Sequence, residues 1–303
     1  CMCHDPAASK ALLKVGDKPF RKLDSRSWDV GSRLSEMDRD GVDLQLLSPM
    51  PELLSYWFEH ADTAELALHV NAAIAEVTAA RGDRFAGLGM VPLQNVGAAI
   101  AMLPRLKADG LVGVEVGSNI NGRYLGEAEF EPFFAAAADL GLAVFIHALH
   151  PLSAPQMKCW PDLVPFAGFI TDTGRCAASL IMSGLPERLP SLRLGFSHAG
   201  GTLLPLVTRL QKGFESTKGF GGSLTVSPRE IASRFFLDSL VYDVELARAL
   251  ALVAPGRICL GTDFPYLIEQ KQPRAFIEAV AVSDNDPIWN RAANEFMHGP
   301  GRH

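Results

Sequence analysis

The stretch Leu142-Ala-Val-Phe-Ile-His147 places five apolar residues directly before a histidine. Its apolar residues do not alternate with polar ones, which is typical of a parallel strand that is covered on both faces. Six further segments of five to seven residues share this character: Val42–Ser48, Phe85–Val91, Val112–Gly117, Leu192–Ser197, Phe235–Ser239 and Arg257–Thr262. We therefore predict seven parallel strands.

Helical patterns separate the predicted strands. They are Glu59–Arg81, Gly97–Ala108, Glu129–Leu140, Thr173–Ser183, Thr202–Lys212 and Val244–Val253. Another helix is predicted at Trp28–Arg39, after a loop-like segment that covers residues 1–27. The alternation of strand and helix predicts a parallel α/β fold, either a doubly wound sheet or a closed barrel. Because no repeat or low-complexity linker interrupts the chain, we expect residues 1–303 to form a single domain.

Composition excludes several classes of protein. The 303 residues are 48% hydrophobic, and 28 Lys and Arg against 34 Asp and Glu give a net charge of −6. This charge predicts no nucleic-acid partner, and no apolar run approaches the roughly 18 residues that span a bilayer. The five cysteines are odd in number and form no CxxC pair, unlike a secreted disulfide framework. We expect a cytoplasmic protein that binds no membrane.

Three of the predicted strands end in residues that carry chemistry. Leu142–His147 ends in His147, Leu194-Gly-Phe-Ser-His198 ends in His198, and Ile258-Cys-Leu-Gly-Thr-Asp263 ends in Asp263. The carboxyl ends of parallel barrel strands converge on one mouth, so we expect these side chains to meet there. Imidazole nitrogen and carboxylate oxygen are ligands that suit Zn²⁺, and a catalytic zinc site takes about three protein ligands.

Five segments together carry a family resemblance, in order and over nearly the whole chain: Gly87–Gln94, Gly113–Gly122, Phe145–Pro151, Phe196–Gly201 and Gly261–Tyr266. On these segments the sequence resembles the amidohydrolase-2 family of metal-dependent amidohydrolases. Within that family it is most similar to the branch of aminocarboxymuconate-semialdehyde decarboxylase and related decarboxylases. The resemblance implies a distorted (β/α)8 TIM-like barrel.

The resemblance also implies roles for the strand-end residues. His147 and Asp263 match metal ligands of the family, and His198 matches the catalytic histidine. The implied cofactor is a divalent metal, either Zn²⁺ or Mn²⁺, with Zn²⁺ the first expectation. Family members carry a His-x-His pair of ligands on a first strand that is not found in this sequence. Because a closed barrel also needs an eighth strand, we expect the first strand to be missing and to precede residue 1.

Further positions match substrate-binding residues of the decarboxylase branch. Arg21 matches an arginine that binds the substrate carboxylate, and Trp160 and Tyr266 match aromatic pocket residues. Arg209 matches an arginine that reaches the neighbouring subunit's site, which implies a homodimer. Glu115 lies within an apolar strand, and two interpretations stay open: a carboxylate at the barrel mouth or a buried structural one.

The function we predict is metal-dependent decarboxylation of a small unsaturated or aromatic carboxylic acid by a carboxy-lyase. One alternative is a metal-dependent hydrolase or hydratase that acts on a lactone or dicarboxylate from aromatic catabolism. A second alternative is a non-catalytic binding protein that has lost the His-x-His ligands.

Overall fold

The computed structural model describes residues 2–5, 10–15, 17–222 and 224–301. Its main sheet contains seven parallel strands, which follow one another across the sheet in chain order. They are β4 (Gln45–Leu47), β5 (Phe85–Gly89), β6 (Gly113–Gly117), β9 (Ala143–His147), β10 (Leu194–Phe196), β11 (Phe236–Asp238) and β12 (Ile258–Cys259). Each strand lies within one of the seven predicted segments, so this prediction is confirmed.

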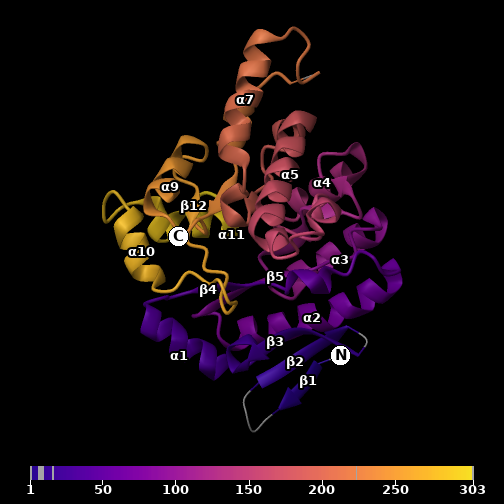
Figure 1. Ribbon diagram of the computed structural model, residues 1–303, viewed down its shortest axis with the longest axis vertical. Coiled ribbons are helices and arrows are strands. Elements are labelled where there is room, and N and C mark those ends of the chain that lie inside the picture. The colour runs from indigo at the N-terminus through magenta and orange to yellow at the C-terminus, as the bar shows by residue number, and fades with distance from the viewer. Residues whose placement is uncertain (1, 6–9, 16, 223, 302–303) are drawn as a thin grey trace.

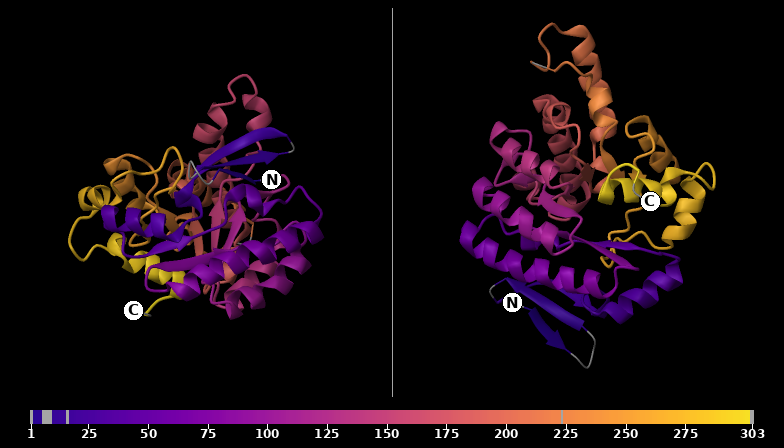
Figure 2. Two further views of the ribbon diagram at one scale, coloured as in Figure 1. Left: turned by 90° about the horizontal axis from the view of Figure 1, so that it is seen from below. Right: turned by 180° about the vertical axis from the view of Figure 1, so that it is seen from behind.

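Helices cover the outside of the curled sheet (Figure 2). They are α1 (Val30–Asp40), α2 (His60–Ala80), α3 (Val96–Ala108), α4 (Glu131–Asp139), α5 (Phe169–Ser183), α6 (Leu185–Arg188), α7 (Leu203–Ser216), α8 (Pro228–Ala232), α9 (Val244–Ala249), α10 (Pro273–Val280) and α11 (Arg291–His298). The predicted α/β architecture of the barrel type is therefore confirmed. In the part of the chain that the structure describes, β4 and β12 are the two edge strands and do not pair with each other.

The two faces of each strand contact different layers. On β9, Val144 and Ile146 belong to the large core that the sheet shares with the surrounding helices. Ala143 and Phe145 point to the opposite face and pack in a smaller cluster inside the curl of the sheet. Both layers are apolar, which explains why the strand sequence does not alternate.

Helix α11 fills the inner cluster near the amino ends of the strands. The ring of Phe296 lies 5.4 Å from that of Phe236 and 6.2 Å from that of Phe145. A Cβ atom on Gly195 would lie 2.8 Å from the Phe296 ring, so the glycine provides the space for this contact. The Arg193 guanidinium donates to the Phe296 carbonyl over 2.6 Å and fixes the helix against the sheet.

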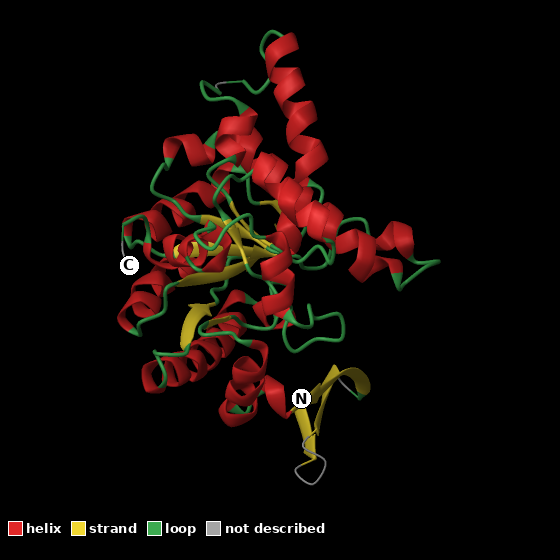
Figure 3. Cartoon of the chain, turned by 90° about the vertical axis from the view of Figure 1, so that its left-hand side faces the viewer, coloured by secondary structure: helices red, strands yellow, loops and turns green. Residues whose placement is uncertain are grey.

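The prediction of a loop-like segment over residues 1–27 is wrong. Strands β1 (Met2–Asp5), β2 (Lys10–Val15) and β3 (Lys18–Asp24) form a separate antiparallel sheet, and a short turn, η2 (Ser25–Ser27), follows it. Residues 15 and 18 pair directly, so only two residues join β2 to β3. Figures 1 and 3 show this small sheet at the edge of the molecule, apart from the main sheet. Within the described parts of this region it pairs with no strand of the main sheet, and its strands lack the long apolar runs by which the others were predicted.

Two further short strands, β7 (Asn119–Ile120) and β8 (Arg123–Tyr124), form a hairpin after β6. Short helical turns complete the chain: η3 (Pro51–Leu54), η4 (Ala128–Phe130), η5 (Ala154–Met157), η6 (Val164–Gly168), η7 (His198–Gly200), η8 (Leu250–Leu252) and η9 (Pro287–Trp289). The outer end of α7 and the loop after it project from the rest of the molecule (Figures 1 and 3). Among the described helices, none is both long and apolar enough to cross a membrane.

Candidate active site

A cavity of about 1410 Å³ extends through the interior of the sheet, from α11 to the carboxyl ends of the strands. Residues from six strands or the loops that follow them line it: β4, β5, β9, β10, β11 and β12. The two edge strands, β4 and β12, both border it. Its polar and aromatic lining includes Ser48, Phe145, His147, Asp238, Asp263 and Tyr266. The convergence of strand ends that the sequence predicted therefore produces one shared cavity.

His147 is the last residue of β9 and lines this cavity. Its Nδ1 atom lies 2.9 Å from the carbonyl oxygen of Ala148, and a carbonyl oxygen only accepts. Nδ1 therefore carries the proton in the neutral ring, and Nε2 keeps its lone pair. Burial, together with the neighbouring His198, lowers the pKa of His147 to about 4. The ring is neutral at physiological pH, which is the form that binds a metal ion.

His198 follows β10 at only 8% exposure, and its ring centroid lies 5.2 Å from that of His147. Burial lowers the pKa of His198 to about 4. Its Nδ1 atom lies 2.9 Å from the Ser197 hydroxyl, which also accepts a hydrogen bond from the backbone N–H of Ala148. The hydroxyl proton is free to point at Nδ1, an arrangement in which His198 carries its own proton on Nε2.

The backbone around His198 is unusual, because four residues in succession have positive φ. The φ angles are 53° at His198, 55° at Ala199, 70° at Gly200 and 58° at Gly201. Asp238, at the end of β11, stabilises this turn: its carboxylate accepts from the N–H groups of His198 at 2.9 Å and Ala199 at 2.7 Å. Non-glycine residues at positive φ cost energy, and charge-assisted hydrogen bonds of this kind offset that cost.

Asp263 follows β12 and lines the same cavity. Burial raises the pKa of its carboxyl to about 7; the nearby Asp238 adds to the shift and Arg21 opposes it. Asp238 is itself buried, and burial raises its pKa. Two acids and two imidazoles thus share a desolvated region, which is where functional sites concentrate perturbed pKa values.

Arg21, on β3, approaches this region from the small sheet. Its guanidinium lies 4.7 Å from the centroid of the Tyr266 ring and donates over 2.8 Å to Oε1 of Glu52. Glu52 lies in η3, the turn after β4, and its charge raises the pKa of His147. Arg21 and Tyr266, which the sequence predicted as substrate-binding residues, are therefore brought together with Asp263 and His147.

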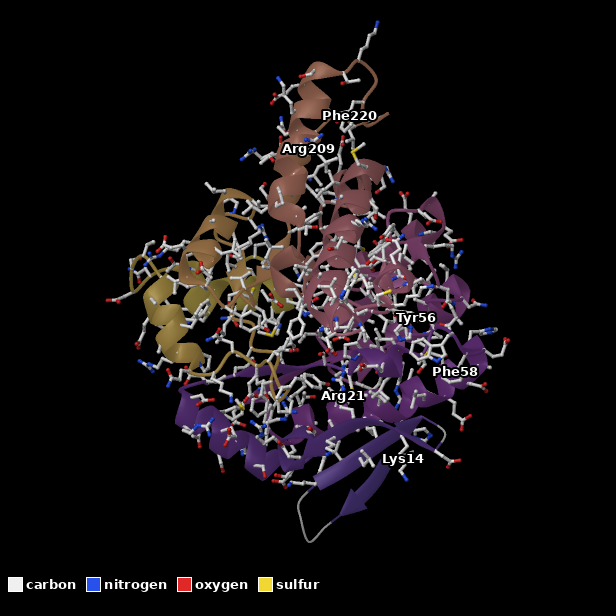
Figure 4. All side chains as sticks on the ribbon, viewed as in Figure 1. Lys14, Arg21, Tyr56, Phe58, Arg209 and Phe220 are labelled. Carbon is white, nitrogen blue, oxygen red and sulfur yellow. The ribbon has the colours of Figure 1, made fainter. Side chains whose placement is uncertain are left out.

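Of the predicted site residues, His147, Asp263 and Tyr266 line the cavity, and His198 and Arg21 contact the rings of His147 and Tyr266 without lining it. Trp160 and Arg209 lie away from it. Trp160 is 68% exposed in the loop that precedes η6. Arg209 is exposed on α7, far from Arg21 in the view of Figure 4. Neither lines the cavity.

Asp238 and Glu52 were not predicted from the sequence. Asp238 had a signal, because it lies next to the end of the predicted strand Phe235–Ser239 and is the last residue of β11. Glu52 had no comparable signal, since it lies in a short turn without periodicity.

The residues present supply part of a metal site. His147 Nε2 and the Asp263 carboxylate border one cavity and are donors of the right chemistry for a divalent ion. Within the described residues, however, no group of three or more His, Cys, Asp or Glu side chains is arranged to hold a metal ion.

Comparisons with known proteins agree with this geometry. A protein-family model described as Amidohydrolase matches residues 4–287. A 2-amino-3-carboxymuconate-6-semialdehyde decarboxylase of Dictyostelium discoideum is 35% identical over 276 residues, covering 89% of this chain and 76% of that protein.

Solved structures extend the comparison. A 5-carboxyvanillate decarboxylase from Sphingomonas paucimobilis superposes with a TM-score of 0.81 at 27% identity, over 88% of this chain and 82% of that one. A dihydroxybenzoic acid decarboxylase from Polaromonas sp. JS666, which contains bound manganese, superposes with a TM-score of 0.80 at 23% identity, over 88% and 85%. These relatives are decarboxylases, so the prediction of similarity to the decarboxylase branch is confirmed. From the family match and the identity to the Dictyostelium enzyme, the chain belongs to the amidohydrolase-2 family.

Proposed function

We propose that this protein is a divalent-metal-dependent carboxy-lyase that removes carbon dioxide from a small unsaturated or aromatic carboxylic acid. The observation that carries the proposal is the pair of neutral imidazoles, His147 and His198, whose ring centroids lie 5.2 Å apart beside a cavity that Asp263 also lines. The Dictyostelium and Sphingomonas relatives, both decarboxylases, support the reaction class.

In the proposed reaction, Arg21 binds a carboxylate of the substrate, because a guanidinium can donate two parallel hydrogen bonds to it. Tyr266 lies against Arg21 and limits the directions in which the guanidinium can turn. The bond between the substrate carbon and its carboxylate breaks, the electron pair stays on the carbon, and carbon dioxide leaves. His198 delivers the proton from Nε2 that this carbon needs, and Asp238 holds His198 in position.

The metal is part of the proposal. His147 Nε2 and Asp263 would hold it, and when bound it would supply a Lewis acid that stabilises developing negative charge. We propose Zn²⁺ as the first candidate for this ion. Mn²⁺ is the second candidate, because a relative of the same fold contains bound manganese.

We further propose a homodimer, in which exposed Arg209 and Trp160 lie close to the partner's cavity. Projection of α7 from the body supports this arrangement, since it carries Arg209 outward (Figure 4). A cytoplasmic location is also proposed, because Cys159, Cys176 and Cys259 are free thiols, as is usual in a reducing compartment.

The test is an assay of the purified protein, after its metal content is measured, against a panel of aromatic and unsaturated carboxylic acids. We expect carbon dioxide release in step with substrate loss, and loss of activity on chelation that Zn²⁺ or Mn²⁺ restores. Lactone opening or hydration without carbon dioxide would contradict the decarboxylase proposal. Absence of metal and of any metal-restored turnover would contradict the proposal of an enzyme.

A further inference from the structure

Four buried carboxylate oxygens at or near the cavity lack hydrogen-bond partners among the described residues. They are both oxygens of Glu115, Oε2 of Glu52 and Oε2 of Glu269, and the other oxygen of Glu269 accepts from Arg26 at 3.2 Å. Glu115 is 0% exposed, and a buried acceptor without a hydrogen bond is costly. A rearrangement that gave these oxygens partners would therefore be favourable.

Glu115 lies on the interior face of the sheet. Its neighbours on β6, Val114 and Val116, both belong to the helix-facing core, so Glu115 points the other way. Phe145 is paired with Glu115 across β6 and β9 and lines the cavity, as does Ser48. Glu115 is thus a buried carboxylate that faces the interior of the sheet without lining the cavity.

Glu52 interacts with both Glu115 and Arg21. The turn η3, which contains Glu52, packs against β6, and the charge of Glu52 raises the pKa of Glu115. Burial is the larger cause, and the two together bring the pKa of Glu115 to about 8, against the opposing effect of the Ser48 hydroxyl. Glu115 is thus mainly protonated at pH 7.

The contact between Glu52 and Arg21 is only half satisfied. Oε1 of Glu52 accepts from one guanidinium nitrogen at 2.8 Å, while no described residue gives Oε2 a hydrogen bond. A bidentate carboxylate would make a stronger pair with the guanidinium. Glu52 therefore binds the Arg21 guanidinium that a substrate carboxylate needs, but through a single hydrogen bond and not through the stronger bidentate pair.

We propose that Glu52 competes with the substrate carboxylate for Arg21, and that Glu115 receives the displaced Glu52 through a shared proton. In that state one proton lies between the two carboxyl groups, and the buried oxygens gain the partner they lack. The inference rests on the proposed role of Arg21 as the carboxylate-binding residue. Through this competition, Glu52 sets the affinity of the site for acidic substrates.

Other charged and titratable groups face the pair. Arg21 and Tyr266 approach Glu52 from β3 and from the loop after β12. The charge of Glu52 also acts on His147, His150 and Asp263 and raises the pKa of each. Tyr56 lies beside Glu115, and its hydroxyl accepts from the N–H of Gly117 at 3.3 Å. Burial raises the pKa of both tyrosines, so neither ionises in the pH range of the test below.

Benzoate binding to the whole chain, after its metal content has been measured, tests the competition directly. Calorimetry on Glu52→Gln should show benzoate binding about tenfold tighter than in the unchanged protein, because the competing charge is removed. Benzamide, which lacks the carboxylate, should bind equally to both. Glu131→Gln, which alters an ion pair with Arg188 on the outer surface, is the matched control and should leave benzoate affinity unchanged. Unchanged or weaker benzoate binding by Glu52→Gln would overturn the proposal, because it would mean that Glu52 supports Arg21.

The shared proton has its own signature. At pH 9 Glu115 is mainly ionised in the free protein, so benzoate binding should take up more protons in the unchanged protein than in Glu115→Gln. Titrations in buffers of different ionisation enthalpy measure this difference. At pH 7 the difference should vanish, since the proton is already present. Equal uptake by both proteins at pH 9 would rule out the shared proton.

These measurements involve no turnover, so they separate the inference from the proposed function. Benzoate binding that depends on Glu52, in a protein that releases no carbon dioxide, would contradict only the decarboxylase proposal.

Discussion

At the scale of single residues, His147 and His198 resist protonation although they lie among acids. Burial is the first cause for both, and each has a pKa of about 4. A neutral imidazole is the useful form at both positions, as a metal ligand in one case and as a carrier of a single proton in the other. The hydrogen bonds to Ala148 and Ser197 then decide which nitrogen carries that proton.

This lowered pKa predicts a loss of stability in acid. An unfolded histidine titrates near 6.5, so between pH 6.5 and pH 4 the unfolded chain binds more protons than the folded one. The stability that neutral His198 contributes is complete above pH 6.5 and is lost as the pH falls toward 4. From pH 7 to pH 5 we expect the loss from this residue to be about 2 kcal/mol.

Urea unfolding at pH 7 and pH 5 measures this loss. His198→Gln should lose less stability on acidification than the unchanged protein, and His69→Gln, which changes an exposed histidine of α2, should behave like the unchanged protein. Equal pH dependence of all three proteins would refute the prediction.

A second prediction separates the metal ligand from the proton donor. His198→Ala should lower turnover about a hundredfold to ten-thousandfold with bound metal retained, since it removes only a proton-transfer group. Asp263→Ala should lose metal as well as activity. Elemental analysis beside the carbon dioxide assay distinguishes the two variants. Full metal and activity in Asp263→Ala would show that the assigned ligand is wrong.

At the scale of elements, the turn between β10 and α7 is the most constrained connection near the site. Gly201 has φ 58°, and a Cβ atom placed on it would lie 1.9 Å from the carbonyl oxygen of Ile170. That carbonyl accepts from the N–H of Thr202 at 3.1 Å, so it cannot withdraw without loss of this bond. Only glycine fits at this position.

Gly201→Ala should therefore destabilise the fold by at least about 2 kcal/mol, because backbone strain and a steric clash act together. Gly141→Ala is the matched control: φ is 65° at Gly141, but no atom lies within 4 Å of the added Cβ. That control should cost only about 1 kcal/mol, from the left-handed backbone alone. Chemical denaturation compares the variants, and equal costs would show that the clash with Ile170 is relieved.

At the scale of the whole molecule, the proposed dimer predicts complementation between two inactive proteins. In a heterodimer of His198→Ala with Arg209→Ala, one cavity combines an intact His198 with an intact Arg209 from the other subunit. We expect about half of the activity of the unchanged dimer, measured on a doubly tagged, purified heterodimer.

The matched control places both substitutions on one subunit and pairs it with an unchanged subunit. That dimer has no complete cavity and should stay inactive. Activity in this control, or none in the first heterodimer, would count against a site shared between subunits.

The main sheet could be predicted because its strands are buried on both faces, as Val144 and Phe145 show, and burial produces unbroken apolar runs. The small sheet was missed since its strands pair only with one another. At the site, the strand-end histidines and Asp263 were predictable from their position after apolar runs. Glu52 was not, because its contact with Arg21 joins a turn to a distant strand and depends on tertiary structure alone.

The contact of α11 with the inner cluster has a consequence for how the chain is synthesised. Phe145 and Phe236 emerge from the ribosome well before Phe296, which packs against both. Until α11 is available, the apolar interior of the sheet is exposed to water, and exposed apolar surface promotes aggregation. The inner cluster can therefore form only after α11 has been made, and the nascent chain exposes this apolar surface until then.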